Sequence, residues 1–120
     1  MTSAIKIHCA LEGLENNFLT FTPKWTQREV RDIDQAVLSD LFSIWLPRKV
    51  VSCYIEREGQ PPITDPKDIS WDAIADCDQQ LYGFLVGAHV SAITQLFFSG
   101  RASASVSSNG IARPGTKSQS

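Results

Sequence analysis

The side chains that could perform acid–base chemistry in this chain are three pairs of acidic residues. Each pair has one residue between its members: Asp32 and Asp34, Glu56 and Glu58, and Asp76 and Asp78. A catalytic acid and base must converge on one substrate, whereas residues two apart on a helix do not face each other. We therefore interpret these residues as solvated charges rather than catalytic pairs.

Histidine and cysteine are the other candidates for catalysis or metal binding. The chain has two histidines, His8 and His89, and three cysteines, Cys9, Cys53 and Cys77. The spacings of structural zinc sites and the CxxC motif are absent, and each cysteine lies in an apolar stretch. Neither a nucleophilic triad nor a glycine-rich phosphate loop is recognisable. The sequence predicts reduced, buried cysteines, no metal and no cofactor. No residue pattern identifies a reaction, and a small enzyme or inhibitor with a site that the sequence does not reveal stays an alternative.

Length and charge restrict the class of protein. With 120 residues, the chain is long enough for one domain with a modest core. Its net charge is −2, and the last twenty residues contain three basic and no acidic residues, which leaves −5 on residues 1–100. Because affinity for nucleic acid comes from Lys and Arg, we do not expect such a partner. The N-terminal sequence does not resemble a signal peptide.

Three segments show the period of two that is typical of half-buried strands. In residues 5–9, Ile5 and Ile7 are on one side of the strand and the polar residues between them are on the other. In residues 18–22, Leu19 and Phe21 are on one side and their neighbours are on the other. The turn-forming residues between them predict an antiparallel hairpin. Residues 49–58 predict a third strand, with Val51 among its inward-facing residues, and the "EGQPP" segment after it predicts a rigid connector.

Besides the strands, the sequence predicts two main helices. Thr26 and Glu29 form a capping-box sequence, which predicts a helix start. Its apolar stripe consists of Val30, Ile33, Val37, Leu41, Ile44 and Trp45. Because proline disrupts helix interiors, we expect this helix to end at Pro47 after about 20 residues.

A second helix is predicted from the N-cap residue Ser70 to Phe98, about 28 residues, with a bend or a close helix contact at Gly83 and Gly87. The serine- and glycine-rich residues 101–120 predict a flexible tail, so that residues 1–100 form the single domain. The fold class is therefore α+β: a small antiparallel sheet, formed by the hairpin and the third strand, with two main helices.

The second helix is apolar around much of its circumference. Residues 81–98 carry no full charge, and the length of this uncharged run approaches that of a membrane span. However, His89, Ser91, Thr94 and Gln95 lie in this run, and the amphipathic strands also need an apolar cover. We therefore predict a core or oligomer-interface helix, and no membrane insertion. One small sheet and one other helix cover it incompletely, which indicates self-association or a protein partner.

Three stretches of the chain resemble the tail assembly chaperones of long-tailed bacteriophages. They are "FLTFTPKWTQREVRDID" (18–34), "RKVVSCYIEREGQPPITDPKDIS" (48–70), and the helix "GFLVGAHVSAITQ" that leads into "GRASASVSSNG". The resemblance implies a non-enzymatic protein of the host cytoplasm that oligomerises and coats the tape measure protein, with the tail tube protein as a second candidate partner. A structural virion protein of the neck, head–tail joining or tail-completion type is the alternative.

A contact surface for such a partner is expected on the second helix. We predict a partner-binding stripe there, with Trp45 of the first helix beside it. Its residues are Phe84, Leu85, Ala88, Ala92, Leu96 and Phe97. The same stripe is equally consistent with an interface between subunits.

Overall fold

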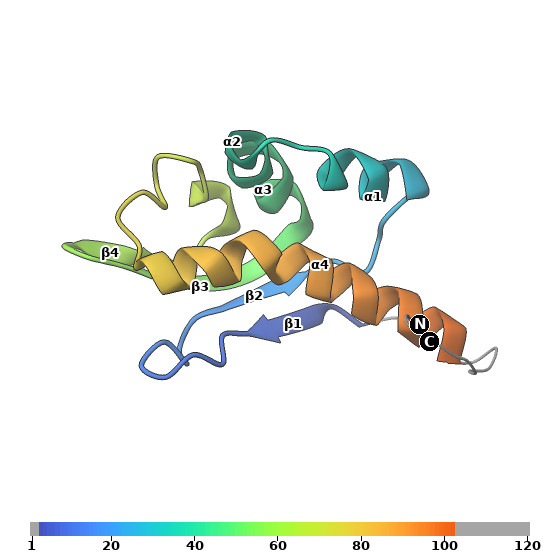
Figure 1. Ribbon diagram of the computed structural model, residues 1–120, viewed down its shortest axis with the longest axis horizontal. Helices are drawn as coiled ribbons and strands as arrows, with labels where there is room; N and C mark the ends of the chain where they lie inside the picture. Colours follow the sequence, from blue (N-terminus) through green and yellow to red (C-terminus); the bar gives the residue numbers. More distant parts are fainter. Residues whose placement is uncertain (1–2, 103–120) are drawn as a thin grey trace, which may run out of the picture.

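A four-stranded antiparallel sheet forms one layer of the protein, and helices cover one of its faces (Figure 1). The computed structural model describes the backbone of residues 3–102 and the side chains of residues 3–98. The strands are β1 (Ile5–His8), β2 (Phe18–Phe21), β3 (Val50–Arg57) and β4 (Gln60–Ile63), in the order β1-β2-β3-β4. This confirms the α+β fold with the predicted hairpin and third strand.

The registers of the strands explain which side chains enter the core. Ile5 pairs with Phe21 and Ile7 with Leu19, and all four side chains are buried. In β3, the prediction that Val51 faces inward is wrong. A β-bulge pairs Phe21 with Val50 and Thr20 with Ser52, so Val51 is the extra residue and is exposed.

The predicted rigid connector after β3 is partly a strand. Gly59 has a φ of +71°, a conformation that favours glycine, and it turns the chain into β4. Pro61 and Pro62 lie in this edge strand, where a missing N–H does not interrupt a central ladder. The Arg57 guanidinium donates to the Pro61 carbonyl oxygen at 2.8 and 3.0 Å and stabilises the hairpin.

The first predicted helix is correct at its start and wrong in its continuity. Thr26 and Glu29 form the capping box at the start of α1 (Gln27–Asp34). The chain then becomes extended at Val37 and continues through α2 (Leu38–Asp40), the π-helical turn η1 (Leu41–Trp45) and α3 (Leu46–Lys49). The interruption leaves Val37 exposed and allows Leu41, Phe42 and Leu46 to enter the core.

Pro47 does not stop the helical run; it is the second residue of α3. Its ring would clash with a carbonyl four residues earlier in a regular α-helix. The wide turn before it relieves this clash, since the Leu46 N–H donates to the Leu41 carbonyl oxygen, five residues back.

The second predicted helix is shorter at its N-terminal end than expected. Residues 71–76 form turns, and after the 3₁₀ turn η2 (Pro66–Asp68) the next helix is α4 (Gln79–Ala102). Ser70 accepts a hydrogen bond from the Ala73 N–H at 3.0 Å, as expected of an N-cap. However, the side chain of Ile74 is buried in the core, and the Glu58 N–H donates to the Asp76 carbonyl oxygen. These two contacts hold the loop against the core and the end of β3. Asp78 caps α4 instead, by accepting from the Gln80 N–H at 2.7 Å.

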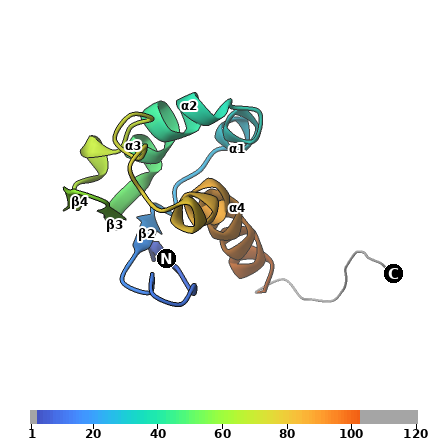
Figure 2. The same cartoon turned by 60° about the vertical axis from the view of Figure 1, so that its left-hand side comes forward.

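At its other end, α4 continues to Ala102, so the predicted domain boundary at residue 100 falls inside a helix. The rest of the predicted flexible tail lies outside the described residues. The helix has 24 residues, about 36 Å at 1.5 Å per residue. Figures 1 and 2 show that its last turns extend beyond the strands.

Gly83 and Gly87 lie within the uninterrupted α4, and a Cβ atom at either position would have nothing within 4 Å. A close helix contact at these glycines is therefore absent from the described fold. We expect Gly87→Ala and Gly83→Ala each to raise the free energy of unfolding by about 0.5–1 kcal/mol, because alanine is the better helix former. Chemical denaturation checks this. Gly59→Ala, at positive φ, is the matched change expected to destabilise, and destabilisation by both α4 variants would contradict the prediction.

Candidate functional site

One face of α4 is part of the protein's own core. Leu81, Leu85, Ala88 and Ala92 follow each other at intervals of four, three and four residues and are at most 2% exposed. This face packs against β1 and β2. Three residues of the predicted partner-binding stripe (Leu85, Ala88 and Ala92) are therefore core residues, and their assignment to a contact surface is corrected.

The other residues of the predicted stripe differ in exposure. Trp45, Phe84 and Leu96 are half-buried against the core. The Arg48 guanidinium lies 5.1 Å from the centroid of the Trp45 ring and partly shields it. Phe97 is 57% exposed and contacts the Phe98 ring edge-to-face. Of the predicted contact residues, Phe97 is thus the one presented most fully on the surface.

A second apolar stripe lies on a partly exposed side of α4. Val86, Val90, Ile93 and Phe97, which we name the exposed stripe, follow each other at intervals of four, three and four. Val90 is 53% exposed, and Val86 and Ile93 are half-buried. The spacing is that of a seam between two packed helices. The exposed stripe is therefore a candidate site for binding another helix.

A hollow of about 190 Å³ borders this stripe, between α1 and α4. Apolar side chains from both helices line it: Val30 and Ile33 from α1, and Val90 and Ile93 from α4. Arg31, Asp34, His89 and Thr94 supply its polar groups. The hollow widens the exposed stripe into a groove with two apolar walls.

His89 is the buried polar group of this groove. The side chain is 8% exposed, and its Nδ1 atom has no hydrogen-bond partner among the described residues. Burial lowers the pKa of His89 from its ordinary value of 6.5, although the charge of Asp34 and a backbone contact to Val86 oppose this shift. Protonating this imidazole in the folded state is therefore unfavourable.

The lowered pKa of His89 predicts a pH-dependent stability. The unfolded chain binds a proton near pH 6.5, whereas the folded chain binds it only at lower pH, so stability falls as pH drops through this window. We expect the free energy of unfolding to decrease from about pH 7.5 to about pH 5.5, and His89→Gln to flatten this slope. Denaturation series at fixed pH values measure it, and parallel slopes for both proteins would contradict the assignment.

The described residues contain no group of three or more His, Cys, Asp or Glu side chains that could hold a metal ion. The cysteines are free, and burial, with Asp65 and Asp68 nearby, raises the pKa of Cys53 to about 11. Such a thiol is mostly protonated at neutral pH and is a poor nucleophile.

By length and composition, the Gln79–Phe98 part of α4 also meets the criteria for a membrane span, with a mean hydropathy of 1.4. Core helices of soluble proteins, which are mostly buried, meet the same criteria, whereas 28% of this window is buried in the single chain. Insertion into a bilayer would remove the buried face of α4 from the sheet. This face consists of Leu81, Leu85, Ala88 and Ala92. Its packing therefore favours a core helix over a membrane span.

Comparison with known proteins adds no relative to this description. No protein-family model, curated protein or solved structure matches the chain. The functional interpretation therefore depends on the surface chemistry of α4 together with the sequence resemblance.

Proposed function

We propose that this chain is a non-enzymatic tail assembly chaperone of a long-tailed bacteriophage. In this role it binds apolar helical segments of the tape measure protein in the host cytoplasm, self-associates, and releases its partner when tail tube subunits replace it. The observation that carries the proposal is the exposed stripe of α4, with Val90 and Phe97 more than half exposed.

The geometry of the stripe fits a helical partner. A helix that inserts apolar residues at intervals of three and four can pack along Val86, Val90, Ile93 and Phe97. Val30 and Ile33 of α1 would flank it on one side. Residues 79–98 of α4 include no charged side chain, so the α4 side of the groove places no fixed charge against an apolar partner, while Arg31 and Asp34 lie on the α1 side.

The rest of the molecule suits a chaperone that must stay soluble. Residues 1–100 carry a net charge of −5, and the outer face of the sheet exposes polar side chains such as Lys6, His8 and Ser52. Repulsion between like-charged bodies limits uncontrolled association, while the uncharged stripe remains available for specific contacts.

Coexpression with the long helical protein encoded nearby in the same genome tests this function. We expect the two proteins to copurify, and the chain to be absent from finished particles. If the chain persists in purified particles, the alternative, a structural neck, joining or completion protein, replaces the proposal. Failure to copurify, in a soluble and folded preparation of both proteins, contradicts the chaperone role.

A further inference from the structure

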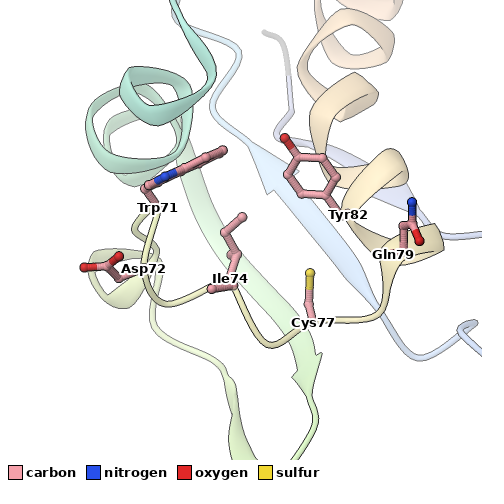
Figure 3. Close-up of a pocket in the computed structure, with 7 residues that line it drawn as sticks. Trp71, Asp72, Ile74, Cys77, Gln79 and Tyr82 are labelled. Carbon is pink, nitrogen blue, oxygen red and sulfur yellow. The ribbon is translucent and has the colours of Figure 1, made fainter.

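A second hollow, of about 350 Å³, lies between the loop before α4 and the first turn of α4. Figure 3 shows the residues that line it. They are Trp71, Asp72, Ile74, Ala75, Cys77, Gln79 and Tyr82. This hollow does not include the exposed stripe and is not used by the proposed function.

An aromatic cluster forms the wall of the hollow. The Trp71 and Tyr82 rings meet edge-to-face with their centroids 6.4 Å apart, and fully buried Phe42 stacks on Tyr82 at 5.7 Å. The Trp71 backbone N–H donates to Ser43 Oγ at 2.9 Å, which ties the loop to η1. The aromatic surfaces are thus held in place before any ligand arrives.

The polar groups of the hollow are available for a ligand. Within the described part of the chain, no hydrogen bond engages the Tyr82 hydroxyl, the Gln79 amide or the Asp72 carboxylate. Asp72 lies at the outer rim and points away from Tyr82 (Figure 3). A ligand that reaches from the interior of the hollow to this rim must therefore be elongated.

The lining of the hollow carries negative and no positive charge. Among the described lining residues none is Lys or Arg, and Asp72 is the charged one. Asp76 and Asp78 follow in the same loop, whereas the Arg57 guanidinium donates to the Ala73 carbonyl oxygen of this loop from outside the hollow. The pKa of Cys77, which lines the hollow, is raised by burial and then by the charges of Asp78 and Asp76. The positive end of α4 does not reverse this field, because Asp78 caps the Gln80 and Leu81 N–H groups.

We propose that this hollow binds a basic side chain, arginine or lysine, of a protein partner. The apolar stem packs against Ile74, and the charged head lies at the rim against the exposed part of the Trp71 ring, on the side of the loop where Asp72 supplies the negative charge. Aromatic faces attract guanidinium and ammonium groups, and long basic side chains bury their stems while the charge stays near water.

Titration with blocked single amino acids tests the proposal. The acetylated amides of arginine, lysine and the neutral analogue norleucine are added to the full chain, together with a separate series of tetramethylammonium, while the Trp71 indole N–H resonance is followed by NMR. We expect saturable shifts with arginine and lysine in the millimolar range, and clearly weaker shifts with norleucine. Equal binding of norleucine, binding of tetramethylammonium only, or no saturable shift each overturns the proposal.

Matched variants test whether the preference for arginine over norleucine comes from the residues of this hollow. Trp71→Leu should abolish the preference for arginine over norleucine, whereas Phe98→Leu, at another exposed aromatic residue, should keep it. Asp72→Asn should weaken arginine binding about threefold, as expected for one exposed charge, and Asp32→Asn should not. An Asp72→Asn effect no larger than that of Asp32→Asn, or an unchanged preference in Trp71→Leu, overturns the proposal.

Discussion

Replacing Val90 and Phe97 together with aspartate is expected to abolish both self-association and copurification with a helical partner. Both side chains are more than half exposed in the single chain, so the fold itself should lose little stability. In a complex, each aspartate would lose apolar burial and place an unpaired charge in the interface. A combined loss of at least about 3 kcal/mol corresponds to more than a 100-fold weaker Kd.

The matched control adds the same two charges to another side of the same helix. Ser91 and Gln95 are exposed and lie outside the exposed stripe. Ser91→Asp with Gln95→Asp should leave copurification and self-association close to those of the unaltered chain. If this variant binds as weakly as Val90→Asp with Phe97→Asp, charge alone explains the loss, and the assignment of the stripe is wrong.

Asn17→Ala is expected to have the largest effect on stability among single polar substitutions at the turn of the hairpin. Asn17 is fully buried and bridges the β1–β2 turn to β3. Its Nδ2 donates to Glu56 Oε1 at 2.9 Å and to the Leu14 carbonyl oxygen at 3.0 Å, and its Oδ1 accepts from the Glu56 N–H at 2.7 Å. Alanine removes all three bonds and leaves partly buried partners at Leu14 and Glu56 without them, so we expect a loss of about 2–3 kcal/mol.

The neighbouring residue provides the control for this prediction. Asn16 is exposed in the same turn, and Asn16→Ala should change the free energy of unfolding by less than about 0.5 kcal/mol. Urea denaturation of both variants measures the difference. Equal effects at the two positions would show that general turn propensity, and not the bridge to Glu56, determines the contribution of Asn17.

The strands and the start of α1 could be predicted because their signals are local. Period-two alternation identified β1, β2 and β3, and the capping box of Thr26 and Glu29 is present as expected. The bulge at Val51 could not be predicted, because it depends on the register with β2. The break at Val37 and the late start of α4 also result from tertiary contacts, which override helical propensity in short segments.

The sequence placed the predicted contact stripe on residues of α4 of which three, Leu85, Ala88 and Ala92, are buried in the core. Two sets of residues on α4 have the same intervals of four and three, one around Leu85 and Ala88 and one around Val90 and Phe97. Periodicity alone cannot decide which set the sheet covers. The small residues Ala88 and Ala92 were the available signal, because they allow a helix to approach a sheet closely.

Association of another protein chain with the exposed stripe of α4 is what both the chaperone role and self-association require. Light scattering coupled to size-exclusion chromatography, at increasing concentrations, measures this most directly for the chain alone. We predict a mass above the monomer value of 13.3 kDa that rises with concentration, and a return to 13.3 kDa when Val90 and Phe97 are both aspartate. A mass of 13.3 kDa for the unaltered chain at every concentration would contradict the account.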